Sequence, residues 1–106
     1  MPKYLVQASY TTEGIKGLLK DGGSKRRTVV EELLKSVGGK LEALYFALGD
    51  TDVFVIADLP DNASVAAATL TVAASGSARV KTTVLMTAEE MDKAAKKTAK
   101  YRAPGQ

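Results

Sequence analysis

Residues 45–61, YFALGDTDVFVIADLPD, place two apolar runs on either side of the quartet 49–52 (GDTD). The segments 40–48 and 52–59 are both typical of strands, and so few residues separate them that only an antiparallel hairpin fits. Both faces of these two strands are apolar, which is unusual for a sheet with one face in water. We therefore expect something to cover each face of the sheet that contains this hairpin.

The quartet 49–52 has two interpretations. Alternate carboxylates, here Asp50 and Asp52, are able to point toward one hard cation, but a useful calcium site gathers about six oxygens and no further acids crowd this loop. In a turn, by contrast, glycine supplies a positive φ and aspartates accept hydrogen bonds from neighbouring backbone N–H groups. We predict a turn and no metal site.

The sequence before the hairpin predicts one strand and one main helix. Residues 3–10 alternate loosely, as a half-buried strand does. Residues 11–23 predict a short, glycine-interrupted turn of helix. An amphipathic helix over 25–37 follows, with Ser24 as its N-cap, and the two glycines at 38–39 end it.

The sequence after the hairpin predicts a helix, a strand and a further helix. Asp61 or Asn62 caps the first helix, which extends to about residue 75. The segment 78–86 is rich in β-branched residues and is predicted to be a strand. Thr87 and Glu90 then have the spacing of a capping box, which marks the start of a last helix.

This order of elements predicts a ferredoxin-like α+β sheet, βαββαβ, with an extra C-terminal helix. We expect a single domain over residues 1–102 and a flexible tail over 103–106. Two main helices cover only one face of such a sheet. We expect a second copy of the chain to cover the other face, sheet against sheet, so that the protein is a homodimer or a larger homo-oligomer.

The composition removes several classes of site. The chain has no cysteine and no histidine, which excludes disulfides, thiolate chemistry and the commonest general base and metal ligand. We expect no cofactor.

The net charge is only +3 and the basic residues share their segments with acids, so we do not expect nucleic-acid binding. The N-terminus does not resemble a signal peptide and no run of about 18 apolar residues occurs, so we expect a cytoplasmic protein without a membrane partner.

The uncovered sheet face is the predicted place for a small-molecule ligand. Polar side chains that converge in an apolar pocket are the usual form of such a site. The predicted ligand-binding residues are Gln7, Ser9, Tyr10, Tyr45, Lys81 and Thr83, with tyrosines, Tyr4 included, as donors at the rim. The alternative is that the tyrosines fill strand surfaces and the lysine extends to the edge of the sheet.

Three further segments each have a functional and a structural interpretation. GGSKRR, at 22–27, places glycines and cations at a helix start, where an anion is favoured, or is simply a solvated basic turn. The uncharged segment 62–75 is either a further contact between subunits or a small-residue helix lying close on the sheet. The cations of 93–102 accompany few large apolar residues, which favours a solvated helix face.

The stretch ALGDTDVFVIADLPD resembles the signature of the GYD domain family, a Gly-Tyr-Asp-like element before the third strand with a Pro-Asp after it. The resemblance extends over nearly the whole chain, although Thr51 stands where the family usually has tyrosine. The matching positions are Tyr10, Thr11, Gly14, Gly39, Gly49, Asp52, Pro60, Asp61, Gly76, Thr83 and Glu90. The resemblance implies a dimeric α+β barrel and implies no activity.

For function, we favour a small oligomeric protein that binds a small molecule or serves as an accessory or structural unit. The chain offers no histidine, no cysteine and no convincing carboxylate pair for catalysis. The enzymatic alternative is a cofactor-independent monooxygenase or isomerase that works in the dimer cavity with Tyr, Lys or Asp as the proton-transfer group. A third interpretation is a structural oligomer built through the uncharged segment 62–75.

Overall fold

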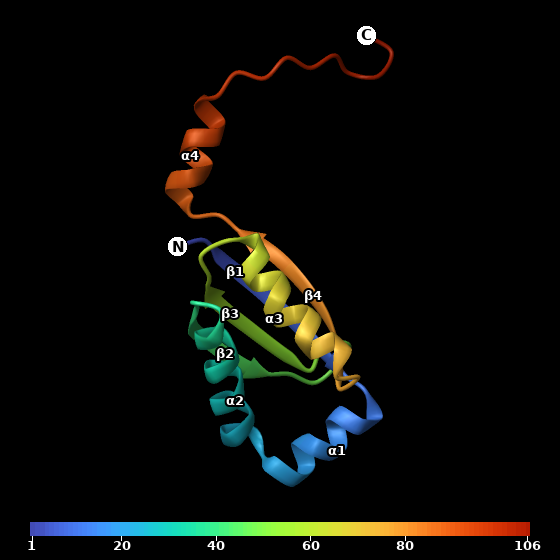
Figure 1. Ribbon diagram of the computed structural model, residues 1–106. Helices are drawn as coiled ribbons and strands as arrows, with labels where there is room; N and C mark the ends of the chain where they lie inside the picture. Colours follow the sequence, from blue (N-terminus) through green and yellow to red (C-terminus); the bar gives the residue numbers. More distant parts are fainter.

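The predicted hairpin forms one half of a four-stranded antiparallel sheet in the computed structural model, which describes residues 1–106. Helices α2 and α3 lie across the same face of this sheet (Figure 1). The elements are β1 (Lys3–Tyr10), α1 (Thr12–Asp21), α2 (Gly23–Ser36), β2 (Lys40–Phe46), β3 (Val53–Asp58), α3 (Asn62–Ala74), β4 (Ala78–Leu85) and α4 (Ala88–Lys96). The strand order β2-β3-β1-β4 confirms the ferredoxin-like α+β prediction with its extra C-terminal helix.

The segment between β1 and α2 differs from the prediction. Instead of one short turn it forms a ten-residue helix, α1, whose N-cap Thr11 accepts a hydrogen bond from the backbone N–H of Gly14 through Oγ1 at 3.2 Å. The chain reverses at Gly22, where φ is +82°, and α2 begins at once. Ser24 is therefore inside α2, and its predicted role as N-cap was wrong.

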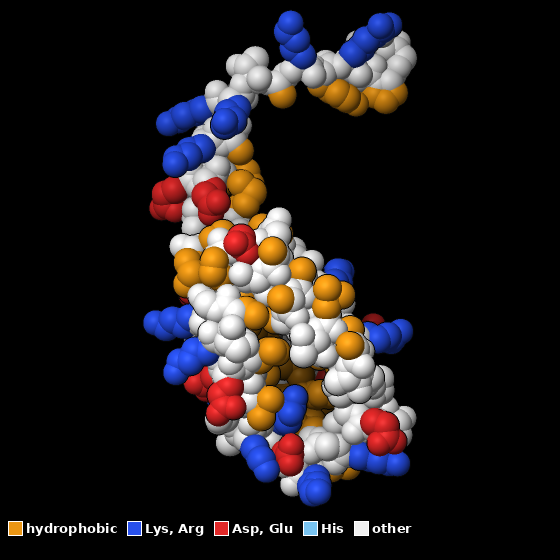
Figure 2. Space-filling model, viewed as in Figure 1, with side chains coloured by type: hydrophobic (Ala, Val, Ile, Leu, Met, Phe, Trp, Pro, Cys, Tyr) orange, Lys and Arg blue, Asp and Glu red, His pale blue; other side chains and the backbone are white.

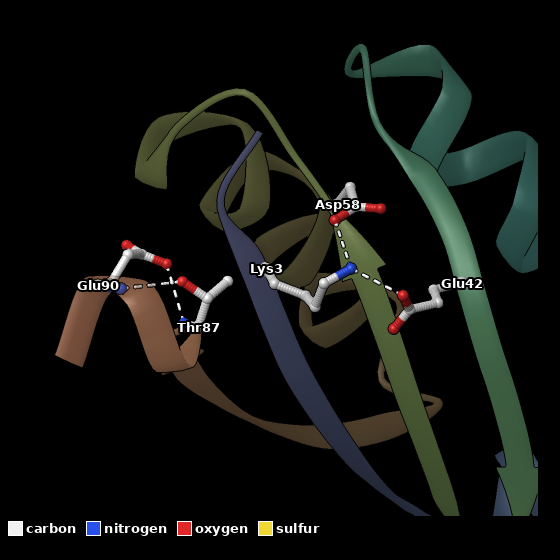
Figure 3. Close-up of polar contacts among 5 residues, drawn as sticks. All are labelled: Lys3, Glu42, Asp58, Thr87 and Glu90. Carbon is white, nitrogen blue, oxygen red and sulfur yellow. Dashed lines mark hydrogen bonds and ion pairs between the residues drawn. The ribbon is translucent and has the colours of Figure 1, made fainter. Parts of the chain in front are cut away.

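The caps of the last two helices are confirmed. Asp61 Oδ1 accepts a hydrogen bond from the Ser64 backbone N–H at 2.8 Å, and Thr87 and Glu90 form the predicted capping box (Figure 3). The hydrogen bonds from Ser64 lower the pKa of Asp61, and those from Thr87 lower the pKa of Glu90. Local sequence signals were sufficient here because each cap is made by residues three positions apart.

The core lies between the sheet and the two helices. Its residues come from alternate positions of the strands and from the inner sides of α2 and α3: Tyr4, Leu34, Leu44, Val53, Val55, Ala57, Leu59 and Val65. Tyr4 is almost completely buried, and its hydroxyl donates to Asn62 Oδ1 at 2.7 Å, which ties β1 to the start of α3. The buried tyrosine therefore keeps a hydrogen-bond partner, as a buried polar group requires.

Much of the chain remains uncovered. Only 11 of 106 residues are buried, and α4 buries none. Helix α4 projects from the end of the sheet, with charged side chains on one side and hydrophobic ones on another (Figure 2). The radius of gyration is 16.9 Å, against about 13 Å for a compact chain of this length. No helix combines the length and apolar character needed to cross a membrane.

A close backbone approach explains a glycine that the sequence presents as a helix breaker. A Cβ at Gly14 would lie 2.0 Å from the carbonyl oxygen of Ser77 and 2.8 Å from Cδ1 of Tyr10. Helix α1 therefore packs directly on the turn before β4. A Cβ at Gly17, one turn further along α1, would have no neighbouring atom within 4 Å.

These two glycines give a matched test of the packing of α1. Gly14→Ala forces the helix away from Ser77 and is expected to destabilise the protein by about 1–3 kcal/mol, the usual cost of overpacking. Gly17→Ala enters open space and is expected to stabilise α1 by up to about 1 kcal/mol through helix propensity. Urea unfolding measures both. Equal effects of the two substitutions would contradict the close approach at Gly14.

The lowered pKa values of the two acidic cap residues predict how the free energy of unfolding changes with pH. Asp61 and Glu90 have folded pKa values below their usual values of 3.8 and 4.5. Their stabilisation is therefore present above those usual values and is lost as the pH falls through the folded values. Helicity and the urea midpoint should fall over this acid range, and less so in the double variant Asp61→Asn, Glu90→Gln, which keeps both caps without their charge. An identical acid response of the two proteins would contradict the assignment.

Candidate ligand-binding site

The face of the sheet that α2 and α3 do not cover is termed the open face. Directly paired residues of neighbouring strands lie on the same face of a sheet, so the register defines which side chains point to this side. The open face consists of Lys40, Ala43 and Tyr45 of β2, Phe54, Ile56 and Asp58 of β3, Lys3, Leu5, Gln7 and Ser9 of β1, and Arg79, Lys81, Thr83 and Leu85 of β4.

The centre of the open face is apolar. Leu5 pairs with Ile56 across β1 and β3, and Phe54 pairs with Tyr45 across β3 and β2. Leu5, Phe54 and Ile56 are only half-buried, and the Tyr45 side chain is exposed. No other segment of the chain packs over these residues.

One end of the open face is closed by an ion-pair network. Lys3 Nζ lies 2.8 Å from Glu42 Oε1 and 2.9 Å from Asp58 Oδ1, and so joins three strands (Figure 3). The hydrogen bond to Glu42, followed by that to Asp58, raises the pKa of Lys3. Both carboxylates at this end of the face are therefore already paired with a cation.

The opposite end holds a hollow of about 360 Å³, termed the cationic hollow. Its lining residues are Gln7, Ser9, Asp50, Thr51, Arg79, Val80 and Lys81. Gln7 Nε2 donates to Thr51 Oγ1 at 3.4 Å, and Ser9 Oγ donates to the backbone oxygen of Asp50 at 2.7 Å. These contacts hold the loop between β2 and β3 beside β1.

The structure brings three of the predicted ligand residues together. Gln7, Ser9 and Lys81 all line the cationic hollow. Thr83 and Tyr45 share the open face with them but lie outside this hollow, beside Leu5 and Phe54 respectively.

Tyr10 does not join this group. It pairs with Ala78 on the helix side of the sheet and packs near Gly14. Tyr4 is buried in the core on the same side. The predicted tyrosine rim is therefore reduced to Tyr45, because strict alternation along β1 sends Tyr4 and Tyr10 away from Gln7 and Ser9.

Four lining residues were not predicted, namely Asp50, Thr51, Arg79 and Val80. Arg79 precedes Lys81 by two positions, and a period of two in a strand was the available signal that both point to one face. Asp50 and Thr51 belong to a loop, whose position beside β1 follows from the pairing of β1 with β3 rather than from local sequence.

Contacts of the quartet 49–52 agree with the turn interpretation. Asp52 Oδ2 accepts a hydrogen bond from the Tyr10 backbone N–H at 2.8 Å, and the backbone N–H of Asp52 donates to Ala8 O at 2.9 Å. Gly49 has a φ of +133°, the positive value expected of it. The side chain of Asp52 therefore completes the backbone hydrogen bonding at the end of β1, whereas Asp50 faces the cationic hollow.

The basic segment 22–27 is largely neutralised by its neighbours. Lys25 Nζ lies 3.7 Å from Asp21 Oδ1, and Arg27 Nε lies 3.3 Å from Glu31 Oε1. The Arg27–Glu31 pair has the i,i+4 spacing of a solvated pair within α2, whereas the Lys25–Asp21 pair joins α2 to the end of α1. These contacts agree with the interpretation of residues 22–27 as a solvated basic turn.

The uncharged helix α3 turns Val65 and Ala68 to the core and exposes small residues and Leu70. Between α2 and α3 lies an apolar crevice of about 70 Å³, lined by nine hydrophobic residues and Thr69. Figure 2 shows this hollow between the two helices. With a single polar side chain it lacks the converging polar groups of a specific ligand site.

The two aspartates of the quartet are expected to differ in their effect on stability. Asp52→Ala removes a charged acceptor from the Tyr10 N–H and should lower the free energy of unfolding by about 1.5–3 kcal/mol. Asp50→Ala removes a side chain without a hydrogen bond and should change it by less than about 0.5 kcal/mol. Urea unfolding of both variants measures this. A cost for Asp50→Ala equal to that for Asp52→Ala would contradict the structural role of Asp52.

Comparison with known proteins identifies one family. The family model described as GYD domain matches residues 4–95, which is nearly the whole chain. No curated protein and no solved structure matched. The match extends from the buried Tyr4 through the hairpin and the β4 strand to the capped helix α4. The chain therefore belongs to the GYD domain family.

Proposed function

We propose that this protein is a homodimer in which two open faces pack against each other, and that it binds a small molecule between them. The observation that carries the proposal is the apolar centre of the open face, which no segment of the chain covers. Leu5, Phe54 and Ile56 form this centre, and Tyr45 extends it to the edge strand. Burying such a surface is favourable, at about 25 cal/mol for each Å² removed from water.

A second copy is the occupant that fits this surface best. The open face has an apolar centre, and a two-fold axis places the same patch on both partners. At one end of the face, Lys3 pairs with both Glu42 and Asp58. A second copy that covers this end therefore buries no carboxylate without a partner. The small number of buried residues in one chain supports the same proposal, since a second sheet would supply the missing half of a core.

The ligand part of the proposal is supported by the cationic hollow. Polar groups from two strands and one loop converge there, directly beside the apolar centre, as in ordinary small-molecule sites. Packing two sheets would place this hollow at the boundary of the interface and close it on one side. The oxygenase or isomerase alternative and the structural oligomer through α3 stay predictions.

Two surface residues of similar exposure test the dimer. Tyr45 on the open face is 71% exposed, and Leu70 on the outer side of α3 is 68% exposed. Tyr45→Glu should weaken dimerisation at least about tenfold, because it introduces an unpaired charge into the interface. Leu70→Glu should not change it. Sedimentation equilibrium measures the mass of each protein against the chain mass of 11.2 kDa.

The wild type and Leu70→Glu are expected at twice the chain mass, and Tyr45→Glu is expected to shift toward one chain. A monomeric wild type would contradict the proposal. A dimer that Tyr45→Glu leaves intact while Leu70→Glu dissociates it would place the interface on α3 instead.

A further inference from the structure

We propose that the cationic hollow binds the carboxylate of an organic acid whose apolar body lies along the open face over Phe54. This inference rests on the proposed dimer, in which the open face is covered. It adds the chemical class of the ligand, the residues that hold its charge and its direction across the sheet.

The first step is the placement of two cations. In the antiparallel register Ser9 pairs with Arg79 and Gln7 pairs with Lys81. Arg79 and Lys81 are thus two positions apart on β4, on one face, with backbone positions separated by about 7 Å. Two donors at this separation are able to approach one carboxylate together.

The second step is the absence of a counter-charge. Neither Arg79 nor Lys81 forms an ion pair or a side-chain hydrogen bond within the chain. At the far end, Lys3 binds Asp58 of the open face and Glu42, which lies at the irregularity in β2. Asp50 is the one acidic residue that lines the hollow. Its negative charge balances one of the two cations, so one positive charge is left over when the face is covered. Removing an unpaired cation from water is costly, and an anionic ligand offsets that cost.

The third step is the donor geometry. The planar guanidinium of an arginine matches a carboxylate with two parallel hydrogen bonds, and a lysine ammonium adds a point charge. Gln7 lies between the cations and the apolar centre, and its Nε2 donates to Thr51 over a long 3.4 Å contact. Its amide is therefore only weakly held and is available to a ligand. Ser9 donates its hydroxyl proton to Asp50 O, so this side chain does not donate to the ligand.

The fourth step is the direction of the ligand. One row of paired residues crosses the whole sheet in the order Tyr45, Phe54, Gln7 and Lys81. With strands about 4.8 Å apart, Lys81 and Phe54 are about 10 Å from each other. A molecule with an anionic group at one end and an apolar body of this length fits the row. Inorganic phosphate would contact only the cationic end of the row, at Lys81.

A matched pair of probes tests the proposal. 2-Naphthoate carries a carboxylate on a bicyclic apolar body, and 2-naphthamide has nearly the same shape without the charge. Titration of each into the wild-type protein is followed by calorimetry and by amide chemical shifts. We expect 2-naphthoate to bind at least about ten times more tightly than 2-naphthamide, with the largest shifts at Gln7, Phe54 and Lys81.

The double variant Arg79→Gln, Lys81→Gln should lose this preference, so that the affinity for 2-naphthoate falls at least about tenfold while that for 2-naphthamide is unchanged. Lys93→Gln, which removes one cation from α4, is the control and should leave both affinities unchanged. Both cations of the hollow lie outside the buried core, so the double variant is expected to fold, which circular dichroism checks.

Several results would overturn the inference: equal affinity for the two probes, no binding of either, or an unchanged preference in the double variant. Inorganic phosphate that displaces 2-naphthoate with equal affinity would overturn the organic class. Dissociation of the dimer by the double variant would mean that the cations pair with acids of a second copy. Sedimentation of the same samples separates the two proposals, because a monomeric wild type defeats the dimer, whereas a dimer without charge preference defeats only this inference.

Discussion

The two-residue alternation of the strands is the constraint on which the rest of this structure depends. Each strand of the sheet must present side chains to both faces, and the hairpin strands β2 and β3 carry apolar residues on both. Helices α2 and α3 cover one face and bury Val55 and Ala57. On the other face Phe54 and Ile56 have no cover from the same chain. The proposed dimer is the consequence of this imbalance between two apolar faces and a single layer of helices.

The same alternation organises the polar groups of the open face. At one end Lys3 joins carboxylates from two other strands, and Lys40 at the same end adds the second positive charge that balances them. At the other end β4 places Arg79 and Lys81 on one face with no acid from a neighbouring strand opposite them. The open face therefore has an apolar centre between a neutral end and a cationic end, so its two ends differ in charge. This asymmetry links the fold to the proposed ligand, because a cation that the proposed dimer covers requires an anion, whichever molecule supplies it.

Features made by neighbouring residues could be predicted from the sequence, and features made by distant ones could not. The caps at Asp61 and Thr87 rest on residues three positions apart, and they were correct. The turn at 49–52 was also predicted from its own residues, although the contacts of Asp52 reach Ala8 and Tyr10 on β1. Gly14 was interpreted as an interruption of a helix because its actual reason, the Ser77 carbonyl oxygen against α1, lies more than sixty positions away. Within the candidate site, Gln7, Ser9 and Lys81 followed from alternation, whereas the loop residues Asp50 and Thr51 depend on the pairing of β1 with β3.

The most direct test of the central claim is to detect contacts between the open faces of two copies. A sample is prepared from equal amounts of carbon-13-labelled and unlabelled protein, and nuclear Overhauser effects are selected between labelled and unlabelled chains. The account predicts intermolecular effects between the methyl groups of Leu5 and Ile56 in one copy and the rings of Phe54 and Tyr45 in the other. Intermolecular effects confined to α3 or α4, or none at all, would contradict it.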